Sequence, residues 1–494
     1  MKHRITAVIL LAAMLTSSAA LAACGDEGAA GNAASTTAAQ EGEAVEEETT
    51  LSEAEARLAI PDNLPDADYQ GYTFRIAGRT RDDFIQEIGA EIEENGDVIE
   101  DSIYHRNHTV MERFNIDIKG VYFDTPQNEV RKSVQAGDDE FDLLLGQVIE
   151  VGATVTDGNY INWYDMPHVN LDQPWYIGNA KDALSIGSKA YMMAGEYCLS
   201  ILRFSYCMYF NKLLIDNYGI ENPYTTVRDG KWTLDRLSDT IKDTYVDLNG
   251  DSVRDGGGDQ FGLVSDYYSA VITYQYAFDN PVMTKAADGV PEVNFNTPKT
   301  AAMVEKLNDF AWNNPGAWFG GWDVYGTIWK DGRTLYLNSL FQSAIGYRDM
   351  ETDFGIIPYP KYDEAQEAYH SMSDGAHTIM AIPKTISDLE RNSVILEALN
   401  AESYKQVIPA YYEIALKVKY SRDEESVAVL DMLLDGRTFD FGYVYDGWKG
   451  YAFILQDLIS SKKPDFASAY AKKEKSATKQ YGGIIDMYLG LDEG

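Results

Sequence analysis

The sequence predicts an α/β fold, and three stretches in its first third carry this prediction. Residues 72–76 alternate between polar and apolar side chains, as a half-buried strand does. Residues 98–114 repeat apolar side chains at helical spacing, and Asp97 is placed to cap that helix. Residues 141–146 are almost wholly apolar, which is typical of a strand buried on both faces. Strands of this kind that alternate with helices indicate a largely parallel sheet.

The other elements fit the same alternation. Residues 116–123 are strand-like and residues 128–136 are helix-like. The C-terminal part predicts helices, for instance over 389–399 and 425–434. About 430 residues follow the N-terminal segments, which is enough for two or more packed domains. Sheets of this kind place ligand sites at the carboxyl ends of their strands.

The N-terminus has the layout of a secretory signal. A short cationic start, residues 2–4, precedes an apolar run that Thr and Ser interrupt. The run ends in Leu-Ala-Ala-Cys-Gly, which resembles the lipobox of bacterial lipoproteins, with Cys24 as its cysteine. This resemblance implies that residues 1–23 are a signal peptide and that Cys24 is lipidated. The mature chain would then be anchored on the extracytoplasmic face of the bacterial cell membrane. The alternative is an ordinary cleavage site beside an incidental cysteine.

Residues 24–65 are predicted to be an acidic, flexible tether. Most of this segment is rich in Ala, Gly, Ser, Thr and Glu and has no apolar periodicity. Such a segment cannot bury enough surface to offset its ordering entropy, and its glutamates repel one another. No later stretch resembles a membrane span, so we expect contact with the membrane through the lipid anchor only.

The charge balance excludes one class of partner. Acidic residues outnumber basic ones by 78 to 41, and the formal net charge is −37. A surface this acidic repels phosphate backbones, so the sequence predicts no nucleic-acid binding. Cys198 and Cys207 are the only cysteines after Cys24. They could form a disulfide in an oxidising compartment or stay as buried thiols, and the sequence leaves both open.

Three further stretches resemble one protein family. Residues 111–147 contain ERFNIDIK and QAGDDEFDLLLGQ, residues 231–235 are KWTLD, and residues 354–361 are FGIIPYPK. In this order they are similar to the extracellular solute-binding proteins that include maltose- and oligosaccharide-binding lipoproteins, which are the substrate-binding components of ABC transporters. The resemblance implies a periplasmic-binding-protein-like fold, with two α/β lobes and a ligand cleft between them.

The resemblance also implies a division of the chain and a mechanism. The first lobe would comprise residues 66–185 and 350–392, and the second residues 190–349 and 393–494. A monomer of this fold would close its lobes on a small solute, for which a sugar is the leading prediction and a peptide an alternative. The closed form would deliver the solute to an ABC transporter permease.

A loop of alternating oxygen side chains predicts a structural calcium ion. It matches the start of an EF-hand loop, with a backbone carbonyl expected at its seventh position. It departs from that pattern at the twelfth position, where Gly258 stands and the next Asp could substitute. The alternative is a polar turn without a metal. The candidate ligands are Asp247, Asn249, Asp251, Val253, Asp255 and Asp259.

Candidate solute ligands are aromatic residues near glycines and polar residues at strand ends. Sugar rings pack on aromatic planes, and their hydroxyls need directional polar partners. For each aromatic side chain the alternative is packing in the core, and for the polar ones it is a surface turn. The aromatic candidates are Trp322, Tyr325, Tyr445 and Trp448. The polar candidates are Arg79, Gln147, Arg348, Asp349 and Asp374.

An enzyme is not the favoured interpretation. The sequence contains no zinc-protease motif, nucleophile elbow, phosphate-binding loop or dinucleotide fingerprint. A glycosidase needs only two carboxylates, so a secreted, lipid-anchored carbohydrate-active enzyme stays an alternative. A surface adhesin is a second alternative, although such a module would more often be repetitive, and no internal repeat is evident.

Overall fold

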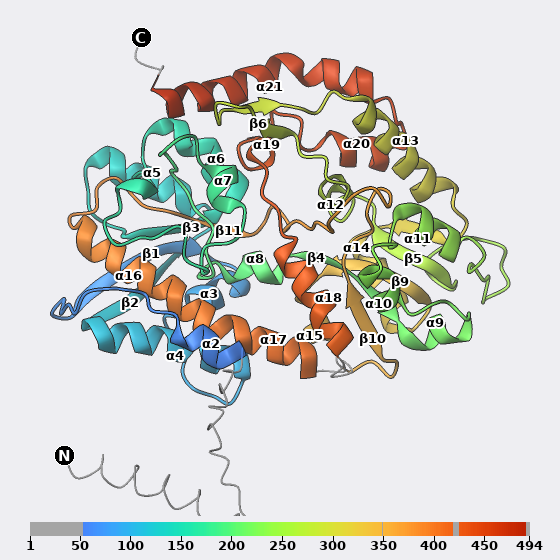
Figure 1. The fold of residues 1–494 in the computed structure, drawn as a ribbon, viewed down its shortest axis with the longest axis horizontal. Helices are drawn as coiled ribbons and strands as arrows, with labels where there is room; N and C mark the ends of the chain where they lie inside the picture. Colours follow the sequence, from blue (N-terminus) through green and yellow to red (C-terminus); the bar gives the residue numbers. More distant parts are fainter. Residues whose placement is uncertain (1–52, 348, 418–423, 491–494) are drawn as a thin grey trace, which may run out of the picture. The chain divides into compact units, whose positions relative to one another are not determined.

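The structure is a computed structural model that describes residues 53–347, 349–417 and 424–490. The predicted signal peptide and Cys24 lie outside the described residues. Within the described part, a four-stranded and a five-stranded sheet are each covered by helices (Figure 1), and a third sheet has two short strands. The predicted α/β class is therefore confirmed. No helix in the described ranges is long and apolar enough to cross a bilayer.

The first sheet contains the three strands predicted from the start of the sequence. Its order is β11-β3-β1-β2. β1 (Tyr72–Arg79) is parallel to both β2 (Ile116–Phe123) and β3 (Leu143–Gln147). β11 (Thr378–Ala381), which comes from much later in the chain, is antiparallel to β3. β3, which is buried except for its last residue, thus has a neighbour on each side, as its apolar sequence requires.

Helices pack against this sheet. α4 (Val98–Phe114) begins where predicted, because the Asp97 side chain accepts hydrogen bonds from the backbone amides of Ile99 and Glu100. The other helices that contact the sheet directly or through α4 are α3 (Asp82–Ile88), α5 (Pro126–Ala136), α6 (Val148–Thr154) and α16 (Leu389–Glu402).

The second sheet is mixed and has the order β10-β4-β9-β5-β8. β5 is parallel to β8 and β9, whereas β4 is antiparallel to β9 and β10. β10 lies in the range predicted for the first lobe but pairs with β4, so the chain returns to the first sheet only after this strand. The strands are β4 (Tyr206–Asn211), β5 (Phe261–Asp266), β8 (Ala317–Gly320), β9 (Thr334–Leu340) and β10 (Phe354–Ile357).

Helices from several parts of the described chain pack against the second sheet, and five of them lie between Lys212 and Lys330. α11 begins at the predicted KWTLD motif, where the Thr233 hydroxyl accepts a hydrogen bond from the Arg236 backbone amide at 3.2 Å. The five are α9 (Lys212–Asn217), α10 (Pro223–Arg228), α11 (Leu234–Ile241), α13 (Pro298–Asn313) and α14 (Trp322–Lys330).

Short elements and the C-terminal helices complete the described part. One of them, α2, lies inside the predicted tether, where the guanidinium of Arg57 stands 4.8 Å from the ring centre of Tyr404. The early ones are α2 (Glu53–Ala59), η1 (Val155–Asp157), η2 (Trp163–Asp165), α7 (Ala180–Leu184), α8 (Leu199–Arg203), α12 (Ile272–Ala277), β6 (Met283–Lys285), β7 (Pro291–Val293) and α15 (Ser343–Tyr347). The late ones are π-helix η3 (Ser403–Val407), α17 (Ile408–Lys417), α18 (Glu424–Asp435), α19 (Phe441–Val444), α20 (Ile454–Ser461) and α21 (Phe466–Leu489).

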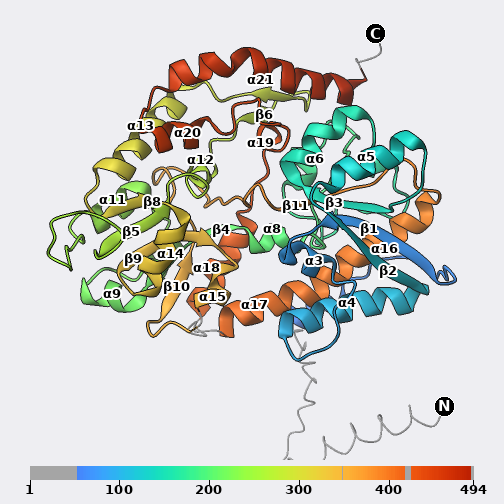
Figure 2. The same cartoon turned by 180° about the vertical axis from the view of Figure 1, so that it is seen from behind.

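The C-terminal helices contact both halves of the described part. α17 packs against α4, whereas α18 packs against β10. α21 runs along the upper edge in both views, from α13 and α20 toward the helices over the first sheet (Figures 1 and 2). The Phe466 ring at its start lies 5.4 Å from Phe295, and the Tyr488 hydroxyl at its end donates to the Leu184 carbonyl at 3.2 Å.

Three chain segments lie side by side between the two sheets. Ser205, just before β4, bridges to Ser373, and Ser371 bridges to Arg437. The backbone amide of Asp374 donates to the Phe204 carbonyl at 2.9 Å, which ties the first two segments together. We call residues 199–206, 371–378 and 436–441 the crossing segments. They form the only backbone pairing between the two sheets that the described residues contain.

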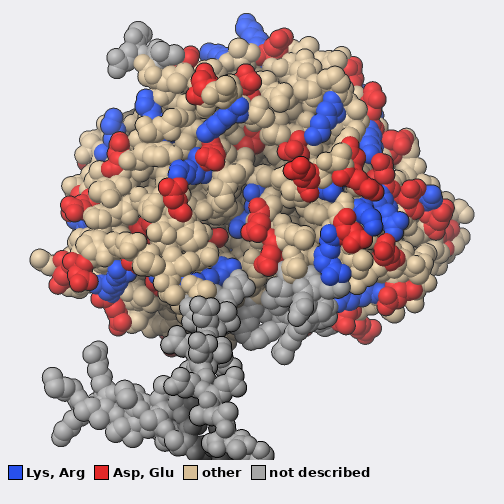
Figure 3. All heavy atoms as spheres, viewed as in Figure 1, with Lys and Arg blue, Asp and Glu red and all other residues tan. Residues whose placement is uncertain are grey.

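The face of the molecule seen in Figure 3 does not concentrate basic charge. On the face seen in Figure 3, lysine and arginine side chains are scattered among acidic ones. Cys198 and Cys207 are both buried free thiols, so the disulfide alternative has no support here.

Glu397 of α16 generates a prediction about pH. Its carboxylate accepts hydrogen bonds from the Trp175 indole at 3.0 Å and from the Tyr176 hydroxyl at 2.5 Å, and burial raises its pKa from 4.5 to about 7. Between these two values the folded state holds a proton that the unfolded state has lost. The contribution of Glu397 to the free energy of unfolding is therefore fully present below pH 4.5 and is lost as the pH rises through about 7.

The Glu397→Gln variant should therefore show a flatter fall in melting temperature than the parent over this pH range. Glu305→Gln, at an exposed position on α13, makes the same chemical change and is the control, which should keep the parent profile. Thermal unfolding followed by circular dichroism at a series of pH values measures both. Parallel profiles for Glu397→Gln and the parent would contradict the assignment.

Candidate functional site

A cavity of about 530 Å³ lies where the crossing segments meet the second sheet. Its wall combines Arg81, which follows β1, and Ala376, which precedes β11, with residues from β4, β5, β9 and α14. Groups positioned by both sheets therefore face one space. This is the location that strand-end sites occupy in open α/β sheets.

Strand register brings the second-sheet residues to one edge. Asp266 ends β5, and Asn338 lies near the end of β9, which is parallel to β5. Tyr206 begins the antiparallel β4 and is paired with Leu340, so its amino end meets the carboxyl ends of the other two strands. The side chains of these four residues line the cavity.

Two carboxylates line the cavity, and each is held in place by hydrogen bonds. Oδ1 of Asp266 accepts from the backbone amides of Tyr268 at 2.8 Å, Ala270 at 3.2 Å and Ser269. Oδ2 of Asp374 accepts from the Tyr206 hydroxyl at 2.8 Å, and Oδ1 accepts from the Ala376 amide at 2.9 Å. These bonds fix both side chains before any solute enters, which lowers the ordering cost of binding.

The cavity also holds a buried amide oxygen without a partner. Asn338 is fully buried, and its side-chain nitrogen donates to the Ser265 and Tyr274 hydroxyls, both at 3.0 Å. Its Oδ1 has no hydrogen-bond partner among the described residues. An unsatisfied buried acceptor is costly, so a bound solute with a hydroxyl donor would gain from pairing with it.

The tyrosines of the cavity stay protonated. Burial, and then Asp374, raise the pKa of Tyr206 well above its usual range. Burial also raises the pKa of Tyr325, and Asp266 and Asp374 add to the shift. Both side chains therefore present neutral phenols, which offer an apolar ring and a hydroxyl to the same ligand.

The structure brings two of the predicted solute ligands together. Tyr325 and Asp374 both line the cavity. Arg79 lies behind the wall, where its guanidinium donates to the Ala376 carbonyl and the Thr378 hydroxyl, both at 2.7 Å. Gln147 ends β3, pairs with Thr378 and does not line the cavity.

The other predicted ligands lie elsewhere. Tyr445 is fully buried, and its hydroxyl meets that of Tyr488. Trp448 is 55% exposed and stacks on Phe453 at 4.5 Å between ring centres. Asp349 is exposed in a turn. Arg348 and the side chain of Trp322 lie outside the described part, although Trp322 begins α14.

Sequence reasoning missed Tyr206, Asp266 and Asn338. Asp266 could have been found, because it ends an apolar strand in the sequence FGLVSD and the strand-end rule applies to it. Tyr206 begins its strand, so its place at this edge depends on the antiparallel pairing with β9. Asn338 lies inside a buried strand, where sequence alone does not distinguish a cavity-lining side chain from one bonded within the core.

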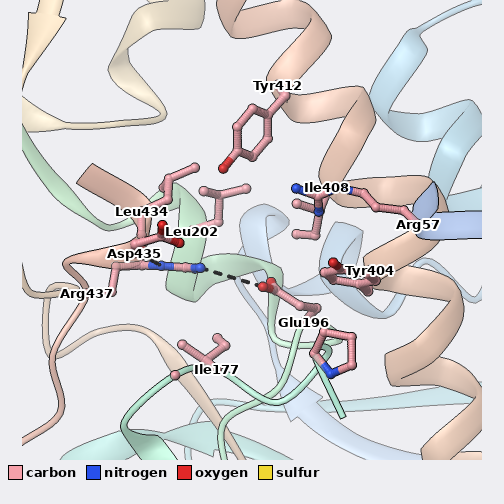
Figure 4. Close-up of a pocket in the computed structure, with 12 residues that line it drawn as sticks. Arg57, Ile177, Glu196, Leu202, Tyr404, Ile408, Tyr412, Leu434, Asp435 and Arg437 are labelled. Atoms are coloured by element: carbon pink, nitrogen blue, oxygen red, sulfur yellow. Dashed lines mark hydrogen bonds and ion pairs between the residues drawn. The ribbon is translucent and has the colours of Figure 1, made fainter. Parts of the chain in front are cut away.

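A second cavity, of about 290 Å³, lies beside the same crossing segments (Figure 4). Leu202 lines this second cavity, whereas Phe204, two residues later, lines the first. Its charged groups partner one another: Arg437 lies 3.6 Å from buried Glu196, and both Arg437 and Arg57 lower the pKa of Glu196 against the raising effect of burial. Because the second cavity is smaller and Arg437 and Glu196 in its wall already form an ion pair, the first cavity is the better candidate for a ligand site.

The predicted calcium loop is a chain of side-chain to backbone hydrogen bonds. Asp247 accepts from the Gly250 and Ser252 amides, at 2.7 and 3.0 Å. Asp259 is fully buried and its Oδ2 accepts from the Asp255 amide at 3.0 Å, while its Oδ1 has no partner among the described residues. The described side chains contain no cluster of three or more His, Cys, Asp or Glu placed to hold a metal ion.

The other predicted ligands of the loop take part in the same network. Asn249 donates to Asp251 at 2.8 Å, and Asp251 accepts from the Val253 amide at 2.7 Å. The donor types suit calcium, and the orphaned Asp259 oxygen is a free ligand atom, but the loop is not drawn together around one point.

Comparison with known proteins places this fold. No protein-family model and no curated protein match the sequence. Among solved structures, the chain is similar to an ABC substrate-binding protein of Listeria monocytogenes in complex with cycloalternan, with 12% identity, a TM-score of 0.51, and coverage of 83% of this chain and 99% of that one. The fold is that of ABC substrate-binding proteins, as the resemblance implied.

A second solved structure agrees. The chain is similar to the maltose/maltodextrin-binding domain of Bdellovibrio bacteriovorus bound to maltotriose, with 16% identity and a TM-score of 0.51. The match covers 83% of this chain and 99% of that domain. At these identities the likeness concerns the fold, so the solute of this chain has to be argued from its own cavity.

Proposed function

We propose that this protein captures a saccharide in the cavity of about 530 Å³ and delivers it to the permease of an ABC importer. The observation that carries the proposal is the cavity's wall, which combines phenol rings with fixed polar groups from both sheets. Phenol rings suit the C–H faces of a sugar ring, and carboxylate and amide oxygens suit its hydroxyls. Both similar structures are described with bound saccharides.

The mechanism follows from where the wall residues lie. Arg81 and Ala376 flank strands of the first sheet, while Asp266 and Asn338 belong to the second. A solute that contacts both groups stabilises the arrangement in which the two sheets approach each other. Binding therefore shifts the population toward a closed form, which the permease would recognise.

Hydrolysis is the second candidate, because two carboxylates line the same cavity. Asp266 and Asp374 could in principle serve as a catalytic pair in a glycosidase. Against this, Oδ2 of Asp374 is occupied by the Tyr206 hydroxyl, and the similar structures are binding proteins. We therefore propose binding without turnover.

A thermal-shift screen against monosaccharides, oligosaccharides and peptides tests the proposal. A stabilising saccharide is the expected result, and its affinity should fall by about tenfold or more in Tyr325→Ala, which removes a ring from the cavity wall. Tyr218→Ala, an exposed tyrosine beside the second sheet, is the matched control and should bind like the parent. Conversion of the sugar to products would favour hydrolysis, and stabilisation by peptides alone would overturn the saccharide assignment.

We also propose that the loop of residues 247–259 binds calcium as a structural ion. Its alternating oxygen side chains and the orphaned Oδ1 of Asp259 support this. Binding would draw the carboxylates together in place of part of their present hydrogen bonds. Asp259 lies two residues before β5, so the ion would brace the strand that ends at Asp266.

Calcium should raise the melting temperature, and chelation should reverse the rise. Calcium at about one hundred times its Kd would stabilise the fold by roughly 2.7 kcal/mol. Asp247→Ala should abolish the calcium-dependent shift, while Asp229→Ala, an exposed aspartate outside the loop, should retain it. Differential scanning calorimetry with calcium or chelator measures this. An unchanged melting temperature after chelation of calcium-loaded protein would refute the site.

The lipid anchor is proposed from the sequence, since Cys24 lies outside the described residues. Acyl chains on this cysteine would hold the protein beside its permease and raise its effective concentration there. Expressed in a bacterium, the full chain should partition with membranes, and Cys24→Ala should move to the soluble fraction. Cys207→Ala, at a buried thiol, is the control for loss of a cysteine. Membrane partition of Cys24→Ala would count against lipidation.

A further inference from the structure

We infer that the cavity selects solutes that are rich in hydrogen-bond donors and carry no negative charge, so that it takes neutral or cationic saccharides and rejects acidic ones. The inference rests on the proposed function, because it names the charge class of the captured solute. It follows from which polar atoms of the wall are already paired and which are left to face a ligand.

The carboxylate of Asp266 is the first of these groups. Three backbone amides converge on its Oδ1, while the described residues show no hydrogen bond to its Oδ2. The side chain is only 9% exposed and lines the cavity. Oδ1 of Asp266 thus stabilises the turn after β5, and Oδ2 is available to accept a hydrogen bond from a solute.

Tyr206 and Asn338 add two more acceptors. The Tyr206 hydroxyl donates its hydrogen bond to Asp374, so it can only accept a hydrogen bond from a solute. Both hydrogen-bond partners of the Asn338 amide nitrogen are protein hydroxyls, which leaves its Oδ1 alone and buried. The wall therefore presents acceptors from β4, β5 and β9, and the amide nitrogen of Gln342 and the hydroxyl of Ser269 add donors to it.

Nearby cations do not cancel this negative character. Arg81 is the only basic side chain that the described residues place in the cavity wall, and it is paired with Asp83 at 2.9 Å and is 60% exposed. Behind the wall, Arg79 faces the buried carboxylate of Glu87, and Arg203 pairs with Asp83 at 2.6 Å. Arg81 and Arg203 thus share the carboxylate of Asp83, whereas Asp266 and Asp374 have no cation as a hydrogen-bond partner in the described part.

A carboxylate or phosphate on the solute would lose its hydration beside two fixed carboxylates and would leave the acceptors of the wall unpaired. Both effects oppose binding, and repulsion plus an unpaired buried acceptor is an effective way to exclude a wrong ligand. Hydroxyl groups satisfy the same acceptors, and an ammonium group gains in addition from the negative potential.

A matched set of monosaccharides and a second set of oligosaccharides test the inference on the full chain at neutral pH. Glucose, glucosamine and glucuronate share one ring configuration and differ in charge, and maltotriose, the glucosamine trisaccharide and trigalacturonate extend the comparison to oligomers. Isothermal titration calorimetry should give neutral or cationic probes an affinity at least about tenfold higher than acidic ones. Equal or tighter binding of the acidic probes would overturn the inference while leaving saccharide capture standing. If a wider panel of saccharides of every charge class failed to bind, the proposed function would fall, and the inference with it.

Asp266→Asn separates the charge from the shape of the site. Asparagine keeps the Oδ1 acceptor that caps the turn after β5, so the fold should be retained. In this variant, the ratio of the affinity for neutral probes to the affinity for acidic probes should fall several-fold. Asp239→Asn, an exposed aspartate on α11, makes the same change in net charge and should leave the ratio unaltered. A purely structural role for Asp266 would weaken all probes alike, and an unchanged ratio in Asp266→Asn would contradict the proposed selection.

Discussion

The pairing of the crossing segments is the constraint on which the rest of the structure depends. The two sheets, each with its helices, form two layers that share no strand. The β-bridges Ser205–Ser373 and Ser371–Arg437 connect these two layers. The same pairing sets Asp374 beside Tyr206, and so builds part of the cavity wall out of the connection itself. A solute that contacts Asp374 therefore touches the segments about which the layers would move, which is how local contacts can bias a global equilibrium.

The polar chemistry of the cavity is a consequence of strand order. Because β5 and β9 are parallel and β4 is antiparallel to β9, a carboxylate, an amide and a phenol from three distant parts of the sequence reach one edge. Each is partly satisfied by the protein, which fixes its orientation, and the Asn338 Oδ1 is left buried without a hydrogen-bond partner among the described residues. The cost of an unpaired buried acceptor such as Asn338 Oδ1 is then recovered only by a ligand that donates.

How far the sequence predicts this arrangement depends on how local each signal is. The first sheet was predictable because a few adjacent residues are enough to indicate the apolar strand β3 and the helix cap at Asp97. The pairing of β10 in the second sheet was not, because strand partners are set by long-range packing. For the site, Tyr325 and Asp374 were predicted from Gly-rich surroundings and a turn, whereas Asn338 looks like any residue of a buried strand until its neighbours are known.

The C-terminal helix limits what movement the crossing segments can allow. α21 has 24 residues and, at 1.5 Å per residue, is a rigid rod of about 36 Å. The Phe466 ring at its start packs against Phe295, just before α13, and the Tyr488 hydroxyl at its end donates to the Leu184 carbonyl. Because α21 contacts both halves of the fold, it resists their separation along the helix axis. A movement of the two halves relative to each other would therefore have to be a rotation that keeps both ends of α21 in place.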